Sequence, residues 1–155
     1  MAEPPTSEPA AGALPFEAFR DTMGVARSGG YRLLSEEPDA VVLAAPVSAE
    51  LLQGDRRVHG GVLATLADTT AVYALLRELW PAQTVSSIDF TLNFLRPAML
   101  EGGELLARAT ILRRGRSVAV CEVELSQGAR LVAKGLFTYA LSARPEGPGR
   151  SVRES

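Results

Sequence analysis

An aspartate lies in the middle of the most apolar part of this sequence. Asp68 is the only charged residue between Arg57 and Arg77. Burying a carboxylate costs several kcal/mol unless it is paired or hydrogen-bonded, so a sequence gains no stability from a charge at this place. The pattern favours a carboxylate that takes part in chemistry. The alternative is a structural aspartate that accepts hydrogen bonds from nearby hydroxyl or backbone groups.

The second chemical feature is the tripeptide His59-Gly60-Gly61, which stands where a helix would begin. Backbone N–H groups in the first turn of a helix have no partner within the helix, and the helix dipole adds positive potential there. Glycine allows a ligand to approach this backbone closely. The start of the helix could therefore stabilise a developing oxyanion, although two glycines are equally typical of a tight entry turn.

The spacing of these features predicts a shared site. Gly60 and Asp68 are eight residues apart, which is about 12 Å along a helix. An aspartate side chain reaches only a few ångströms, so one helix cannot easily bring both groups to one carbonyl. If both act on the same group, they come from different subunits, and the sequence predicts an obligate homodimer with two shared sites.

The elements that must position these residues follow from the apolar pattern. The segment 60–79 is typical of one long helix that Trp80-Pro81 ends. A short helix is expected at 15–23, a loop at 53–57, and strands at 31–35, 40–47, 84–96, 104–113, 117–126 and 131–141. A helix that is apolar nearly all round must be covered on most sides, and a single antiparallel sheet that curls around it would do so.

Length and composition indicate one domain, at residues 15–142 of the 155. The segments 1–14 and 143–155 are rich in small, polar and proline residues and are expected to be disordered tails. A net charge of −2 gives no general reason to bind nucleic acid or an anionic membrane. The single cysteine, Cys121, is expected to be a buried small hydrophobe, and a cytoplasmic location is expected because no secretory signal is visible.

The pattern Gln53…His59-Gly60-Gly61…Asp68, followed by the segments 89–97 and 114–117, resembles the hotdog-fold acyl-CoA thioesterases of the phenylacetate-pathway (PaaI-like) group. It is also similar to the 4-hydroxybenzoyl-CoA thioesterases of the Arthrobacter type. The resemblance covers roughly residues 30–141. It implies an α+β hotdog fold, a curled antiparallel sheet wrapped around one long central helix, assembled as a dimer or a dimer of dimers (a homotetramer). It implies no metal ion and no cofactor, since CoA is part of the substrate.

The resemblance also implies roles for individual residues. Asp68 would attack the thioester carbonyl or activate water for that attack. The backbone N–H of Gly60, less so that of Gly61, would polarise the carbonyl oxygen with help from Gln53. His59 would fix the loop and the start of the helix, and a role as general base is the less favoured alternative.

A serine that orients the water is implied on the following strand. Ser87 lies close to the family position, with Ser86 as the alternative, and only one of the two can face the site because neighbouring residues of a strand point to opposite sides. Two departures stand out. Many relatives have glycine where Arg56 stands, and the Arthrobacter-type enzymes carry a threonine where Val72 stands, which favours the serine-assisted version here.

The CoA phosphates need cations. The segment Arg113-Arg114-Gly115-Arg116-Ser117 places three guanidinium groups around a flexible glycine, where charge-assisted hydrogen bonds to phosphate can form. The alternative is an ordinary solvated hairpin. Gly61 is expected to contact the substrate as well.

The function that these features favour is hydrolysis of an acyl-CoA thioester to the free acid and CoA. The alternatives are a non-catalytic acyl-CoA sensing protein and, less in keeping with His59-Gly60-Gly61, a hotdog hydratase or dehydratase. The acyl group stays open among aryl-acetyl, hydroxybenzoyl and medium-chain groups.

Overall fold

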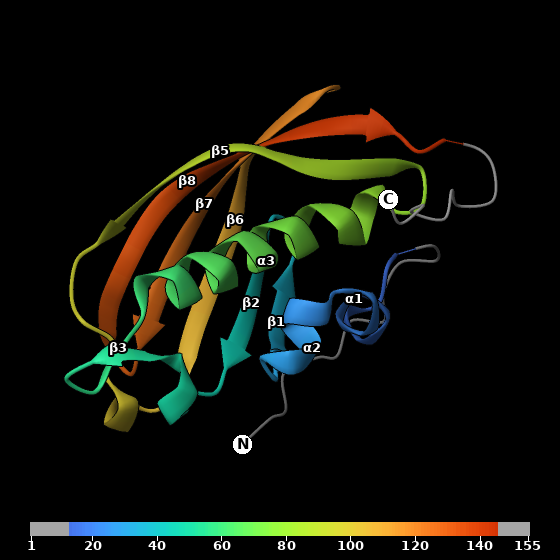
Figure 1. Cartoon of the computed structure of the whole chain (residues 1–155). Coiled ribbons are helices and arrows are strands. Elements are labelled where there is room, and N and C mark those ends of the chain that lie inside the picture. The colour runs from blue at the N-terminus through green and yellow to red at the C-terminus, as the bar shows by residue number, and fades with distance from the viewer. Residues whose placement is uncertain (1–12, 146–155) are drawn as a thin grey trace, which may run out of the picture.

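The computed structural model describes residues 13–145 and is built around one helix, α3 (Gly60–Leu79). Half of its residues are buried, including Ala67, Ala71 and Ala74, whose small size lets the surrounding layers approach closely. The helix ends at Leu79, and the extended residue Trp80 that follows precedes a proline, as the sequence predicted. Figure 1 shows α3 lying in the concave side of a curved sheet.

The sheet has six antiparallel strands in the order β1-β2-β6-β7-β8-β5. Their bounds are β1 Arg32–Glu37, β2 Ala40–Ala45, β5 Gln83–Phe94, β6 Leu105–Arg114, β7 Val118–Gln127 and β8 Arg130–Ala143. All six expected strands are confirmed, with ends that differ by up to two residues. The arrangement is the α+β hotdog fold that the resemblance implies. Strand β5 stands at one edge and bonds only to β8 among the described strands.

The concave face of the sheet carries small and medium apolar residues at every second position. Leu105, Ala107 and Ala109 on β6 are buried, as are Cys121 and Val123 on β7. The period of two places these side chains on the side of α3. The expectation that Cys121 is a buried hydrophobe is confirmed, and burial raises the pKa of its thiol to about 12.

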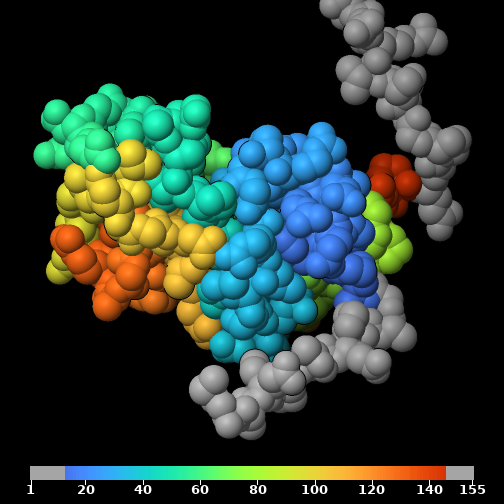
Figure 2. Space-filling model, turned by 90° about the horizontal axis from the view of Figure 1, so that it is seen from below, coloured from blue at the N-terminus to red at the C-terminus, as the bar shows by residue number. Residues whose placement is uncertain are grey.

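Two short helices, α1 (Phe16–Thr22) and α2 (Gly24–Ser28), cover the end of α3 that lies away from His59. The rings of Phe16 and Phe19 pack against Tyr73 at centroid distances of 5.1 and 5.0 Å. Figure 2 shows the blue segment of α1 and α2 beside the light-blue hairpin of β1 and β2. Helix α1 was expected, but α2 was not, because five residues are too few to show a helical period.

The segment before α3 is a small hairpin, so the expectation of an irregular loop at 53–57 is wrong. Strands β3 (Leu52–Gly54) and β4 (Arg57–Val58) pair with each other, and Arg57 forms a bridge with Met99. Figure 2 shows this green segment packed beside the yellow segment around residue 100. Arg56 has a φ of 59°, in the left-handed region that favours glycine, which gives a physical reason for glycine at this place in relatives.

The expected tails fall mostly outside the described residues. Leu14 belongs to the folded part, since its N–H donates to the carbonyl of Arg77 at 3.0 Å. Strand β8 continues to Ala143, and the guanidinium of Arg144 lies 3.8 Å from the centre of the Trp80 ring. Between residues 13 and 145, no helix is long and apolar enough to cross a lipid bilayer.

Candidate active site

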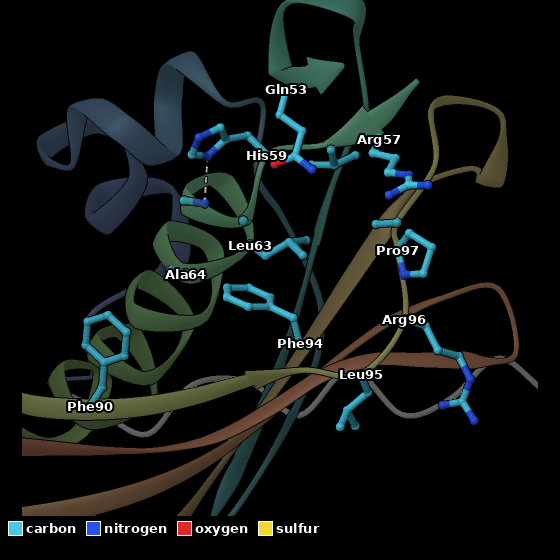
Figure 3. Close-up of a pocket in the computed structure, with 14 residues that line it drawn as sticks. Gln53, Arg57, His59, Leu63, Ala64, Phe90, Phe94, Leu95, Arg96 and Pro97 are labelled. Atoms are coloured by element: carbon cyan, nitrogen blue, oxygen red, sulfur yellow. Dashed lines mark hydrogen bonds between the residues drawn. The ribbon is translucent and has the colours of Figure 1, made fainter. Parts of the chain in front are cut away.

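A pocket of about 860 Å³ opens at the start of α3. Four of the expected site residues line it, namely Gln53, His59, Gly60 and Gly61. Figure 3 shows Gln53 above the pocket, extending from the β3–β4 hairpin, and His59 where the chain enters α3. The short hairpin and the helix start therefore bring Gln53 and Gly60 together, although six residues lie between them in the sequence.

Apolar side chains line the pocket on two sides. Phe90 and Phe94 come from β5, and Leu63 and Ala64 come from α3. The Phe90 ring stacks on Phe137 of β8 at 5.0 Å with an angle of 8° between the ring planes, which fixes its orientation. This lining suits an apolar ligand, with a few polar groups at one end of the pocket.

Hydrogen bonds at the start of α3 leave one N–H group free. The Gly61 N–H donates to Nδ1 of His59 at 2.8 Å, and the Val62 N–H donates to the carbonyl of His59 at 2.9 Å (Figure 3 draws the first of these). Among the described residues, the N–H of Gly60 has no acceptor. Gly60 rather than Gly61 is therefore the donor available to a carbonyl oxygen in the pocket.

The same contact defines the tautomer of a neutral His59 ring. Because Nδ1 accepts a hydrogen bond, it carries no proton, and the proton of a neutral ring is on Nε2. The free lone pair that a general base needs is thus occupied by Gly61. The geometry supports His59 as the residue that caps the helix, as the sequence suggested.

The close packing around the start of α3 explains why both positions are glycine. A Cβ atom at Gly60 would lie 3.1 Å from the Phe94 ring, and one at Gly61 would lie 3.0 Å from Nδ1 of His59. Both contacts are tighter than most real Cβ contacts. The two glycines therefore permit the His59 cap and the position of Phe94 in the pocket wall.

Asp68 lies near the middle of α3, half-buried, and one of its oxygens accepts two hydrogen bonds. Ser87 Oγ donates to Oδ1 at 3.2 Å, and the Tyr139 hydroxyl donates to the same atom at 2.9 Å. Ser87, not Ser86, faces the carboxylate. Before a one-residue bulge between Ser87 and Asp89, Ser87 pairs with Tyr139 of β8, whose side chain faces α3.

Tyr139 is the polar contact that sequence reasoning missed. Its side chain is 0% exposed, and burial together with the negative charge of Asp68 raises its pKa far above the ordinary value. The phenol therefore keeps its proton and acts as a donor. The available signal was the alternation along β8, in which Phe137, Tyr139 and Leu141 share the face toward α3.

The two groups of polar residues stay apart within one chain. Neither Asp68 nor Ser87 nor Tyr139 lines the pocket at Gly60. This agrees with the helical spacing of about 12 Å between Gly60 and Asp68. One chain thus carries two separate groups of polar residues at different places along α3.

Comparison with known proteins gives the family. Residues 56–134 match the model of the thioesterase superfamily. The chain is 32% identical to human acyl-coenzyme A thioesterase 13 over 115 aligned residues. The alignment covers 73% of this chain and 81% of the human protein. The chain belongs to the thioesterase superfamily.

Other superfamily members give the same result. The acyl-coenzyme A thioesterase PaaI of Escherichia coli is 31% identical over 108 residues, 70% of this chain and 74% of PaaI. The solved structure of E. coli PaaI has a TM-score of 0.72 at 26% identity and covers 81% of this chain and 88% of that one. A thioesterase structure from Haemophilus influenzae has a TM-score of 0.75 at 25% identity, covering 84% and 92%.

In this superfamily member the arginine-rich turn lies away from the Gly60 pocket of its own chain. Arg114 pairs with Glu78 near the end of α3, and Arg113 and Arg116 are exposed. The strand register places Arg114 in one row with Ala119, Tyr139 and Ser87. The turn therefore lies toward the end of the sheet that carries the Asp68 contacts.

The pocket has arginines of its own. Arg57 and Arg96 line it, and Nη1 of Arg96 donates to the carbonyl of Leu131 at 3.1 Å. Sequence reasoning treated Arg57 as part of a loop and Arg96 as part of the family pattern. Their proximity depends on the bridge between Arg57 and Met99, for which the sequence carries no local signal.

Proposed function

We propose that this protein hydrolyses acyl-CoA thioesters to the free acid and CoA, at sites shared between two subunits. The observation that carries the proposal is the Asp68 carboxylate, which is half-buried in the central helix and positioned by two hydroxyl donors. The free N–H of Gly60 beside an apolar pocket supplies the complementary electrophilic group. The relatives named above, which are acyl-coenzyme A thioesterases, agree with this chemistry.

The edge of the sheet supports the shared site. Strand β5 has a free edge among the described residues, and it exposes Ile88, Phe90 and Phe94 to 58%, 48% and 56%. Long edges with large apolar side chains are typical of surfaces that pair with another chain. We infer that β5 pairs with β5 of a second copy of this chain around a two-fold axis.

The geometry of that pairing brings the half-sites together. Two copies of one strand related by a two-fold axis in a sheet run antiparallel, so the first half of each β5 lies beside the second half of the other. Ser87, which touches Asp68, belongs to the first half, and Phe94, which touches the pocket at Gly60, lies at the end of the second half. Asp68 of one subunit would therefore serve the pocket of its partner. The dimers are in turn proposed to form a tetramer.

The chemistry has two routes that use the same groups. In the first, Asp68 takes a proton from water, the water oxygen adds to the carbonyl carbon, and the carbon–sulfur bond breaks, after which Asp68 returns the proton to the CoA thiolate. In the second, an Asp68 oxygen adds to the carbonyl and expels the thiolate, and water hydrolyses the resulting anhydride. In both, the Gly60 N–H and the Gln53 amide stabilise the oxyanion.

The function is tested by a panel of CoA esters that includes aryl-acetyl, hydroxybenzoyl and medium-chain acyl groups. Release of CoA is followed with a thiol reagent, and binding is followed by calorimetry. Turnover of at least one ester supports the proposal. Tight binding of an ester without release of CoA would instead show a sensing protein and contradict hydrolysis.

Mixing two inactive variants tests the shared site. Chains with Asp68→Asn and chains with Gly60→Pro each form homodimers in which both sites lack one group. A heterodimer contains one intact site, built from Gly60 of the first chain and Asp68 of the second. Random pairing in a 1:1 mixture is expected to restore about a quarter of the wild-type rate, since half the dimers carry one working site of two.

The variants are unfolded together and refolded, with separately refolded samples as the control. Size-exclusion chromatography should show a dimer or tetramer in every sample. If each chain acted alone, the mixture would have no more activity than its components.

The arginine-rich turn is proposed to hold the CoA phosphates. In the dimer it lies toward the partner's pocket, because it is at the end of the sheet where β5 begins. Neighbouring strands are about 4.8 Å apart, and three such spacings from β6 to β5 separate Arg114 from Ser87 by roughly 15 Å, a distance that an extended cofactor spans. Charge-assisted hydrogen bonds suit this task.

Arg116→Ala is therefore expected to raise KM for an acyl-CoA about tenfold and to leave kcat unchanged. The measurement is steady-state kinetics with the CoA ester and with the matching N-acetylcysteamine thioester, which lacks the phosphates. The truncated substrate should show no change in KM. Arg27→Ala, an exposed arginine on α2, is the matched control. An equal effect on both substrates would contradict the phosphate role.

A further inference from the structure

We propose that Tyr139 is a positioning residue, which holds Oδ1 of Asp68 so that Oδ2 faces the reacting carbonyl. The inference rests on the proposed hydrolysis at Asp68 and assigns the orientation of the carboxylate to a residue of β8. The contact is direct, at 2.9 Å from the phenol oxygen to Oδ1. The same hydroxyl lies 3.4 Å from the backbone carbonyl oxygen of Asp68.

The hydrogen bonds divide the two carboxylate oxygens. Oδ1 accepts from Tyr139 and from Ser87, which uses both of its lone pairs. Within the part of the chain that the structure describes, no donor contacts Oδ2. Rotation of the carboxylate about its bond to Cβ would break two hydrogen bonds at once. The free oxygen is thus held in one direction, which makes it the oxygen that takes a proton or attacks carbon.

The two donors to Oδ1, Ser87 and Tyr139, differ in how strongly the fold restricts their position. Ser87 lies on the edge strand β5 and is exposed. Rotation about its single side-chain bond moves the hydroxyl oxygen away from Asp68. Tyr139 lies on β8, which is paired on both sides, with Ser87 of β5 and with Ala119 of β7. Figure 1 shows β8 between β5 and β7. The buried ring therefore sets the position to which the carboxylate is held.

The protonation of the phenol fits a donor and not a proton-transfer group. Burial is the largest cause that raises the pKa of Tyr139, and the charge of Asp68 and its hydrogen bond act in the same direction. At neutral pH the hydroxyl keeps its proton. Tyr139 thus contributes through Asp68 and has no direct role in the chemical step.

The test is Tyr139→Phe, which keeps the buried ring and removes only the hydroxyl. Loss of a hydrogen bond to a charged group is expected to lower kcat about tenfold. KM should change less than about twofold, because the acyl and CoA contacts are untouched. Thermal unfolding is measured on the same samples.

Tyr73→Phe is the matched control. Tyr73 is 1% exposed, and its hydroxyl donates to Oε1 of Glu36 at 2.6 Å, away from the pocket and from Asp68. The Tyr73→Phe variant loses a phenol–carboxylate hydrogen bond of the same kind and should keep the wild-type kcat. A loss of kcat in Tyr139→Phe that Tyr73→Phe does not share supports the positioning role.

A second comparison uses Ser87→Ala, alone and combined with Tyr139→Phe. Since both donors act on one oxygen, each single variant keeps one hydrogen bond on Oδ1, and the double variant frees the carboxylate to rotate. The double variant is expected to lose more activity than the product of the two single losses. Simple multiplication of the losses would contradict a shared task.

The outcomes separate this inference from the proposed function. If the wild type turns over a CoA ester and Asp68→Asn does not, but Tyr139→Phe keeps full kcat, the inference is overturned and the hydrolysis stands. A loss that appears only in KM, or that follows a lowered unfolding temperature shared with Tyr73→Phe, also overturns it. Absence of turnover in the wild type overturns both.

Discussion

Asp68→Asn is expected to lower kcat by about 10³-fold, within the range for removal of a catalytic acid–base group. Asparagine has nearly the same shape, and its side-chain oxygen can still accept from Ser87 and Tyr139. The substitution removes the negative charge, and with it the ability to take a proton or attack a carbonyl. The fold does not depend on that charge, since no cation pairs with Asp68 among the ion pairs of the described residues.

The measurement is CoA release under saturating substrate, together with KM, thermal unfolding and elution volume. Unfolding and elution should match the wild type, so that the loss belongs to the chemical step. Asp21→Asn, at an exposed carboxylate on α1, is the control for removal of one negative charge. Retention of full kcat by Asp68→Asn would exclude Asp68 from the reaction and restore the structural interpretation of this carboxylate.

Gly60→Pro is expected to lower kcat by about 10²-fold, the effect of losing one oxyanion donor. Proline removes the N–H and little else. Proline is favoured at the first position of a helix, and His59 has φ −62° and ψ 134°, which a residue before proline adopts readily. No hydrogen bond of the folded chain is lost, because the Gly60 N–H has no acceptor among the described residues.

Gly60→Ala is the matched control for this variant. It introduces the same Cβ atom, 3.1 Å from the end of the Phe94 ring, but keeps the N–H. The alanine variant should therefore retain most of the wild-type kcat. Equal losses in both variants would assign the effect to displacement of Phe94, and full activity in Gly60→Pro would show that another group polarises the carbonyl.

The sequence by itself determined the central helix and the candidate catalytic residues within it. The apolar segment 60–79 is long, and the proline after Trp80 ends it, so both ends of α3 were predicted correctly. The six strands followed from alternation and from glycine-containing turns. Asp68 was recognisable because a charge in such a helix needs a reason, and this argument uses only local sequence and the cost of burial.

Short elements escaped prediction because they are stabilised by residues far away in the chain. Helix α2 has five residues, and β4 has two, with a bridge from Arg57 to Met99. The left-handed conformation of Arg56 was equally hidden, since arginine gives no local signal for it. All of these features depend on tertiary contacts, and β4 supplies Arg57 and Val58 to the lining of the pocket.

Only the tertiary structure decided which groups surround Asp68. Tyr139 is 71 residues away in the sequence, and its contact depends on the register of β8 against β5 and β7. The choice of Ser87 over Ser86 depends on a one-residue bulge, and a shift of one residue turns every following side chain to the other face. The sequence shows the position of the Asp68 carboxylate. The strand register determines which of its two oxygens is hydrogen-bonded and which is free.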